Sequence, residues 1–239
     1  MKRLQTLWLL FVICVCSASA QIGDGESGII TPIQKKGKAY NYELSIGVQA
    51  AGGVSMMSEG DGLSVYDGSS MSFGGGAALN VRFGGKDSRN RDLHGQGLLG
   101  VGLELNYRQH TVKTLGQDDL KLGYFEVPFM VQLYPLYNGK HLRNFYIEAG
   151  PTFAGTLSSK PDVLTVGNTS YRTGDIKGFD IKASVGLGYR FNEGSANDGF
   201  YVNARYNFGT SDLAGNFPAK ISTAEITIGY MFKCIGSKR

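Results

Sequence analysis

The sequence has few of the residues that usually stabilise an exported protein or build a catalytic site. It contains three cysteines and six prolines in 239 residues. Cys14 and Cys16 lie within the first twenty residues, and only Cys234 remains beyond them. A single thiol cannot form an internal disulfide. We therefore expect the chain to be held together by hydrogen bonds and side-chain packing alone.

Beyond its N-terminal segment the sequence also lacks a long hydrophobic run. Residues 1–20 have a basic start, an apolar run at 7–15 and an Ala-x-Ala ending. That run is shorter than the roughly 17 residues that a membrane-spanning helix needs. The pattern predicts a secretory signal peptide, cleaved after Ala20.

Charge and known motifs point to no cofactor, metal or nucleic acid. The net charge is +4, and losing Lys2 and Arg3 with the signal leaves about +2 (4 − 2), too little to favour a nucleic-acid partner. Zinc-type spacing and phosphate loops are absent. The three histidines, His94, His110 and His141, fall in different expected connections, with His110 outside the membrane near acidic residues.

Period-two alternation of apolar and polar residues runs through the rest of the chain and is typical of β-strands. In each strand the apolar face has no charged residue. Most of these strands are about 10 to 13 residues long, a little over the 9–11 residues that a tilted strand needs to cross a bilayer. An even number of such strands is typical of a transmembrane β-barrel. The eight expected strands are 40–49, 71–83, 99–108, 124–134, 145–154, 179–191, 200–208 and 223–233. We predict an all-β fold, an eight-stranded antiparallel transmembrane β-barrel.

Three features favour a membrane barrel over a soluble, lipocalin-like one. The polar faces are rich in glycine, which suits the crowded interior of a small barrel rather than a solvated surface. Their acids and bases are balanced in number, as an enclosed polar interior requires. Aromatic residues gather near both strand ends, as at the two interfaces of a membrane. The expected girdles are Tyr40, Tyr42, Phe83, Phe145, Phe191, Phe200 and Phe232, and Phe73, Tyr107, Phe125, Phe153, Phe179 and Phe208.

The charged side chains of the polar faces should therefore meet inside the barrel. We expect them to form a charge-paired plug, with loosely solvated charges around a thin water channel as the alternative. The expected lumen network is Glu43, Arg82, Glu104, Arg108, Glu126, Glu148, Lys182, Arg190, Arg205 and Glu225. Counting outward from the turns puts Arg205 opposite Glu225, and Glu104 opposite Glu126 with Arg205 or Arg108 reaching them.

Pro128 lies in the middle of an expected strand, although it has no amide proton for a sheet ladder. Counting from a turn near residues 138 and 139 puts Pro128 opposite Gly150, next to Pro151. Two missing donors would then lie in one seam. We predict a bulge or a gap in the ladder between the fourth and fifth strands.

The alternation also predicts how the chain is divided. We expect a signal peptide at 1–20, a short periplasmic segment at 21–39, the barrel at 40–233 and a tail at 234–239. With the mature chain starting in the periplasm, the outer connections are 51–70, 110–118, 158–177 and 209–220. The periplasmic turns are 84–97, 135–143 and 192–198.

Two stretches resemble a known family. "YFEVPFMVQLYP" (124–135), with its Glu-Val-Pro core, and "FYIEAGPTFAG" (145–155) are similar to the PorT-like outer-membrane β-barrel proteins of Bacteroidota. The resemblance implies a Gram-negative outer-membrane barrel, in a family whose founding member belongs to a protein-secretion and gliding apparatus. The sequence departs from the common terminal aromatic residue of such proteins, because "KCIGSKR" follows Phe232.

These observations favour a non-enzymatic barrel of the cell outer membrane, with a structural or surface-recognition role through its loops. Outer-membrane lipid and other envelope proteins are the expected partners, and we expect a monomer. The alternatives are an outer-membrane enzyme with a rim site at His110 and a soluble ligand-binding barrel.

Overall fold

The structure is a computed structural model that describes most of the chain beyond residue 41. The described residues are 42–60, 65–84, 96–115, 118–137, 142–166, 169–173, 176, 178–192, 199–213 and 218–235. The expected signal peptide (1–20), the segment 21–39 and residues 236–239 of the expected tail lie outside them, as do Tyr40, His94 and His141. Within the described part, no helix is long and apolar enough to cross a membrane.

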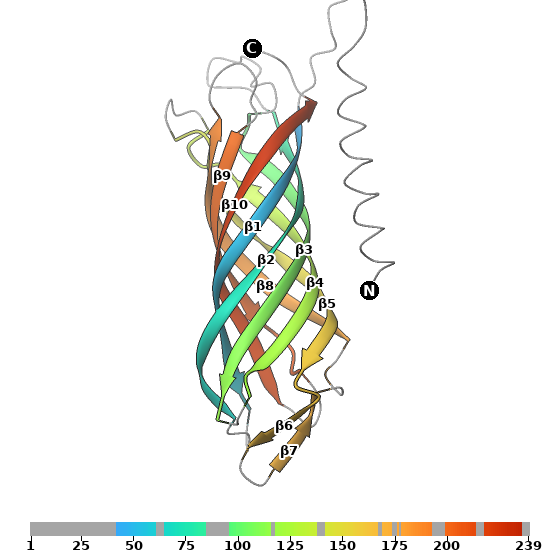
Figure 1. Ribbon diagram of the computed structural model, residues 1–239. Helices are drawn as coiled ribbons and strands as arrows, with labels where there is room; N and C mark the ends of the chain where they lie inside the picture. The colour runs from blue at the N-terminus through green and yellow to red at the C-terminus, as the bar shows by residue number, and fades with distance from the viewer. Residues whose placement is uncertain are drawn as a thin grey trace, which may run out of the picture. The chain divides into compact units, whose positions relative to one another are not determined.

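Eight long strands close into one antiparallel barrel (Figure 1). Around the barrel the order is β1-β10-β9-β8-β5-β4-β3-β2, and β1 pairs with β10 to close it. The strands are β1 (Tyr42–Glu59), β2 (Tyr66–Phe83), β3 (Leu99–Thr114), β4 (Leu120–Leu133), β5 (Phe145–Lys160), β8 (Phe179–Asn192), β9 (Gly199–Gly209) and β10 (Ala219–Ile235). Each expected strand is present, so the predicted fold class is confirmed.

The alternating faces are oriented as a membrane barrel requires. Phe129, Val185 and Ile228 point outward and are 43%, 45% and 56% exposed. Glu104 and Arg205 point inward and are only 8% and 5% exposed. Because a soluble barrel would bury the first group and expose the second, the soluble alternative is wrong.

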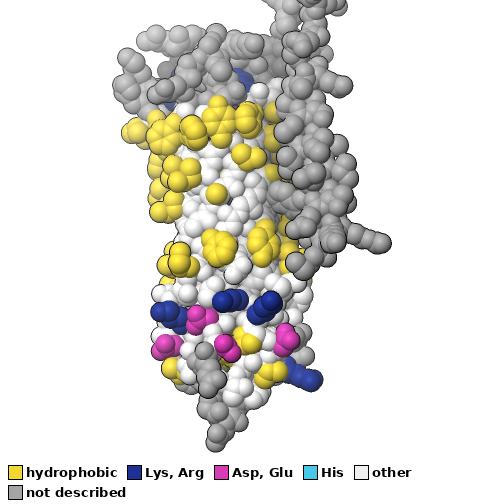
Figure 2. Space-filling view, in the orientation of Figure 1, with side chains coloured by type: hydrophobic (Ala, Val, Ile, Leu, Met, Phe, Trp, Pro, Cys, Tyr) yellow, Lys and Arg dark blue, Asp and Glu magenta, His cyan; other side chains and the backbone are white. Residues whose placement is uncertain are grey.

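Aromatic residues form outward-facing groups at two levels of the barrel. Near the end where β1 begins and β10 ends, which we call the terminal end, Phe200 lies opposite both Phe191 and Tyr230. Toward the opposite end, which we call the loop end, Tyr107 lies opposite Phe125. Such residues favour the interface levels of a bilayer. Figure 2 shows a broad apolar band on the visible face, and charged side chains begin on its loop-end side.

The strands extend farther toward the loop end than the alternation predicted. Parts of the expected connections 51–70, 110–118 and 158–177 belong to β1, β2, β3 and β5. The reason is a change in which face is apolar. On β4, Leu120 and Leu122 point inward and are buried, whereas Lys121 between them is exposed. The interior of the barrel is therefore apolar at this end, and the outside is polar, as in a soluble protein.

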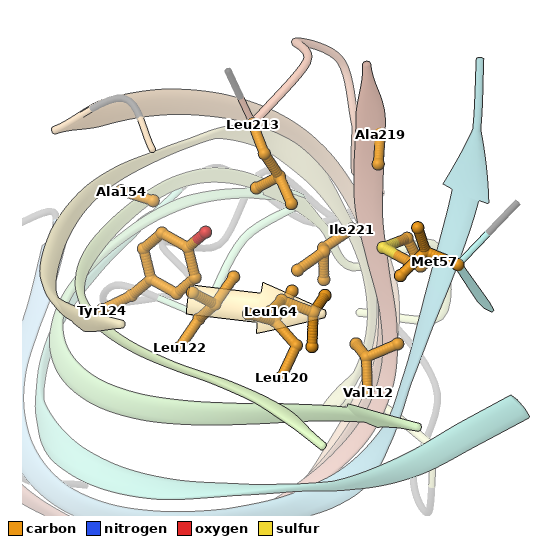
Figure 3. Packing of buried hydrophobic residues seen from close by; sticks show 11 residues of the cluster. Met57, Val112, Leu120, Leu122, Tyr124, Ala154, Leu164, Leu213, Ala219 and Ile221 are labelled. Carbon is orange, nitrogen blue, oxygen red and sulfur yellow. The ribbon is translucent and has the colours of Figure 1, made fainter. Parts of the chain in front are cut away.

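A short hairpin covers this apolar interior. It consists of β6 (Val163–Val166) and β7 (Thr169–Arg172), within the stretch expected to be a loop. Figure 3 shows Leu164 of the hairpin among side chains from the barrel wall. The buried cluster, called here the mouth cluster, is Met57, Val65, Val112, Leu120, Leu122, Tyr124, Ala154, Leu164, Leu213, Ala219 and Ile221. These apolar side chains come from the barrel wall, the hairpin and a connection, and they pack together inside the mouth of the barrel.

The two prolines interrupt two different seams. Pro128 lies opposite Thr152, not Gly150, because the β4–β5 register differs by two residues from the one expected. The β4–β5 ladder has a gap at the level of Pro151, so the predicted gap is confirmed. Pro128 is not part of this gap. It interrupts the ladder between β3 and β4 instead. The prediction of two missing donors in one seam is therefore wrong.

Candidate functional site

Three strands place an arginine between two carboxylates at the middle of the lumen. Arg205 on β9 reaches Glu104 on β3 and Glu148 on β5, with its Nη2 at 2.6 Å from a carboxylate oxygen of each. Its Nη1 donates to the second oxygen of Glu104 at 3.0 Å, and its Nε donates to Glu148 at 3.0 Å. The planar guanidinium matches carboxylate geometry, so these charge-assisted hydrogen bonds are strong.

Amide side chains complete the hydrogen bonding of the two carboxylates. Gln49 donates to Glu104 at 2.7 Å, as does Asn106 at 2.9 Å. Asn203 and Gln132 donate to Glu148 at 2.9 and 3.0 Å. A buried ion pair is stable only when its remaining hydrogen-bonding groups are satisfied. We call Arg205, Glu104, Glu148 and these four amides the central network.

A second charged group lies between the central network and the mouth cluster. Lys182 on β8 donates to Glu126 at 2.6 Å, and the His110 Nε2 lies 3.2 Å from the same carboxylate oxygen. The His110 Nδ1 faces the hydroxyls of Ser55 and Ser72 at 3.2 and 3.0 Å. With Nε2 protonated and donating to Glu126, Nδ1 accepts from a serine, and the imidazole is satisfied on both sides.

This arrangement corrects the expectation for His110. It was placed in an outer connection, but it lies on the lumen wall of β3 with no exposed surface. A serine and a carboxylate flank the imidazole, as nucleophilic catalysis requires. However, Ser55 is also fully buried, and the mouth cluster lies on one side of the group and the central network on the other. Among the described residues, these atoms have no exposed surface at the imidazole or at the serine hydroxyl.

Two arginines, Arg82 and Arg190, lie in the lumen near its terminal end. Arg82 donates hydrogen bonds to the backbone carbonyls of Gly97 at 2.9 Å and Arg143 at 3.0 Å. These two hydrogen bonds link two connections to the barrel wall. The guanidinium carbon of Arg82 lies 3.7 Å from the centre of the Tyr134 ring, and that of Arg190 lies 6.0 Å from it. Stacked guanidinium and phenol groups fill this end of the barrel.

The expected pairings of the other lumen charges hold only in part. Arg205 lies directly opposite Glu225 as predicted, but its side chain turns to Glu104 and Glu148. Glu225 faces Arg108 instead, at 3.4 Å from Arg108 Nε, and that guanidinium donates no hydrogen bond to any of the described residues. Glu126 lies opposite Asn106 and not Glu104, so no direct carboxylate pair forms across that seam. The remaining acid, Glu43, lies 3.6 Å from Lys233.

Glycines make room for the large lumen side chains. Gly188 lies opposite Tyr146, and Gly229 opposite Tyr201. A Cβ at either glycine would lie 2.4 Å from the tyrosine ring. This alternation of small and large residues fills the narrow interior. Among the described residues, no group of His, Cys, Asp and Glu is arranged to hold a metal ion.

The comparisons identify the family of this barrel with buried charges in its lumen. Residues 32–215 match the family described as "Outer membrane protein beta-barrel domain". The chain belongs to this family. It is therefore an integral protein of the outer membrane, and its apolar band faces lipid.

Solved structures similar to this outer-membrane barrel are distant from it. The attachment invasion locus protein Ail of Yersinia pestis shares 17% identity, with a TM-score of 0.40, over 81% of this chain and 100% of that one. OprG of Pseudomonas aeruginosa shares 13% identity, with a TM-score of 0.42, over 81% and 96%. AlkL shares 12%, with a TM-score of 0.41, over 90% and 100%. No curated protein matches the chain.

The ten expected lumen residues all lie inside this outer-membrane barrel, each 8% exposed or less. The polar partners Gln49, Asn106, Gln132 and Asn203 were not singled out beforehand, although each lies on the polar face of a strand. Their position on the same face as the charges is the signal that could have found them. Asp180 and Lys233 are the other charged residues of those faces, and Asp180 accepts a hydrogen bond from Ser211.

Proposed function

We propose that this outer-membrane barrel neither conducts solutes nor catalyses a reaction, and that it acts through the surface it projects beyond the membrane. One observation carries the proposal: buried side chains lie in the lumen at four successive levels, with Arg82 at the terminal end, then the central network, the Lys182 group and the mouth cluster. The strands continue past the apolar band, and the β6–β7 hairpin adds further surface at the loop end. Loops held by a rigid scaffold are common sites of recognition.

The PorT-like resemblance refines this proposal. The Glu-Val-Pro core of β4 and the "FYIEAGPTFAG" stretch of β5 support a place near the PorT-like proteins of Bacteroidota. Through that resemblance, an envelope protein of a secretion apparatus is a candidate partner for the loop end. We expect the loop end to face the cell surface, since single-chain bacterial barrels have their longer loops outside.

A photo-crosslinking experiment in intact cells tests the surface role. A photoreactive amino acid at Val163, which is 47% exposed on the hairpin, should give a discrete protein adduct. The matched control is the same amino acid at Ile228, 56% exposed on the lipid-facing side, which should give no such adduct. Replacing Val163–Arg172 by a Gly/Ser linker, with the probe moved to exposed Asp162, should remove the adduct. The same adduct from all three forms, or none from Val163, would contradict the proposal.

A further inference from the structure

Three lysines form a patch on the outer surface of the barrel, on the adjacent strands β3, β4 and β5. Lys121 and Lys160 lie directly opposite each other across the β4–β5 seam. Lys121 also lies opposite Thr111, two residues before Lys113 on β3. All three side chains are exposed, and the chain neighbours of Lys113 and Lys121 are buried. We call Lys113, Lys121 and Lys160 the lysine patch.

The patch is electrostatically unfavourable by itself. Like charges directly opposite on neighbouring strands destabilise a sheet. Exposed acids lie close to these lysines: Asp118 and Asp119 precede Lys121, Asp162 follows Lys160, and Asp67 is next to Gly68, which lies opposite Lys113. Within the part of the chain that the structure describes, none of them forms an ion pair with a patch lysine. An anion bound between the lysines would offset this repulsion.

The position of the patch indicates which anion. On β4, Lys121 lies four residues from the aromatic Phe125 toward the loop end, and the three residues between them are buried. Four residues correspond to about 13 Å along a strand, or about 9 Å along the membrane normal at a tilt near 45°. The headgroup layer is about 5–7 Å thick, and a lysine side chain reaches back toward it. Lipid phosphates therefore lie within reach.

The order of charges beyond the apolar band agrees with this position. On the face in view in Figure 2, most Lys and Arg side chains at the loop end lie next to the apolar band, and most Asp and Glu side chains lie farther from it, although a basic side chain also lies beyond the acids. Bases nearest the membrane attract anionic headgroups, and acids farther out are kept from them. The opposite order would repel the same headgroups.

We propose that the lysine patch binds the phosphate groups of outer-leaflet lipids. Lys121 and Lys160 hold one phosphate between them, and Lys113 contacts it from the third strand. The site lies on the outside of the barrel and does not depend on the side chains in the lumen. It fixes the height of the barrel in the membrane and recruits anionic lipid to one side of it.

The test compares lipids that differ only in the phosphate. The folded protein in a non-ionic detergent is titrated with phosphatidic acid, with diacylglycerol and with inorganic phosphate, and bound lipid is counted by native mass spectrometry. We expect phosphatidic acid to bind and diacylglycerol not to bind. The variant K113Q/K121Q/K160Q should bind phosphatidic acid at least about tenfold more weakly. Raising the salt concentration should weaken the wild-type interaction.

Lys220→Gln is the matched control, because Lys220 is on β10, which is three strands away from the patch in either direction around the barrel. This variant should bind phosphatidic acid as tightly as the wild-type protein does. Gel mobility before and after heating reports whether each variant is folded. If the triple variant does not fold, K160Q alone should show a weaker version of the same loss. Equal loss in Lys220→Gln, equal binding of diacylglycerol, or inorganic phosphate binding as tightly as phosphatidic acid would each overturn the proposal.

Discussion

Replacing Arg205 with methionine should lower the free energy of unfolding by about 3–5 kcal/mol, the usual cost of removing one partner of a buried ion pair. The loss is large because the guanidinium hydrogen-bonds to both Glu104 and Glu148. Without it, two buried carboxylates remain with only amide donors around them. Urea unfolding in lipid vesicles, followed by the gel mobility of the unheated protein, measures the change.

Arg108→Met is the matched control for this prediction. Arg108 is as deeply buried, but its contact with Glu225 is longer, at 3.4 Å, and includes no hydrogen bond. Its removal should therefore cost clearly less than that of Arg205. Arg205→Lys should recover only part of the stability, because an ammonium cannot bridge both carboxylates with the same geometry. If Arg205→Met and Arg108→Met lower the free energy of unfolding equally, the central network is not the main polar contribution to the stability of the barrel.

Gly229→Val should prevent the barrel from folding, or destabilise it by about 3 kcal/mol or more through overpacking. A Cβ at Gly229 would lie 2.4 Å from the ring of Tyr201. That ring cannot move aside easily, because its hydroxyl donates to Gln49 of the central network. The folded fraction after refolding into vesicles measures the effect.

Gly52→Val is the matched control, since Gly52 is exposed on the outward face and its Cβ would have no neighbour closer than 4.0 Å. It should fold with the wild-type yield. Replacing Tyr201 with leucine in the Gly229→Val background should restore part of the folded fraction. If Gly52→Val and Gly229→Val behave alike, the glycines of the polar faces are not there to accommodate lumen side chains.

The sequence predicts the membrane-spanning part of this barrel well, because each strand there has an apolar and a polar face. Phe129 and Glu126, on opposite faces of β4, show how alternation determines which side chains meet lipid and which meet each other. The charge pairs are less predictable, since they depend on register. A register two residues from the expected one puts Asn106, not Glu104, opposite Glu126.

The loop end could not be predicted in the same way, because the chemistry of the two faces is exchanged there. Lys121 points outward where a membrane strand would have an apolar residue, and Leu122 points inward. For the same reason the lumen position of His110 was not predicted. His110 is the last polar lumen residue of β3 before the buried Val112 of the mouth cluster. The hairpin gave no signal, since each of its strands has only four residues.

Conductance of the wild-type protein in a planar lipid bilayer tests the central claim most directly, namely that paired charges and the mouth cluster fill the barrel from end to end. The account predicts no steady ionic current at either polarity, while a porin added afterwards to the same bilayer gives its normal current steps. A stable, ohmic current from the inserted wild-type barrel would mean that water and ions pass the central network, and would contradict the account.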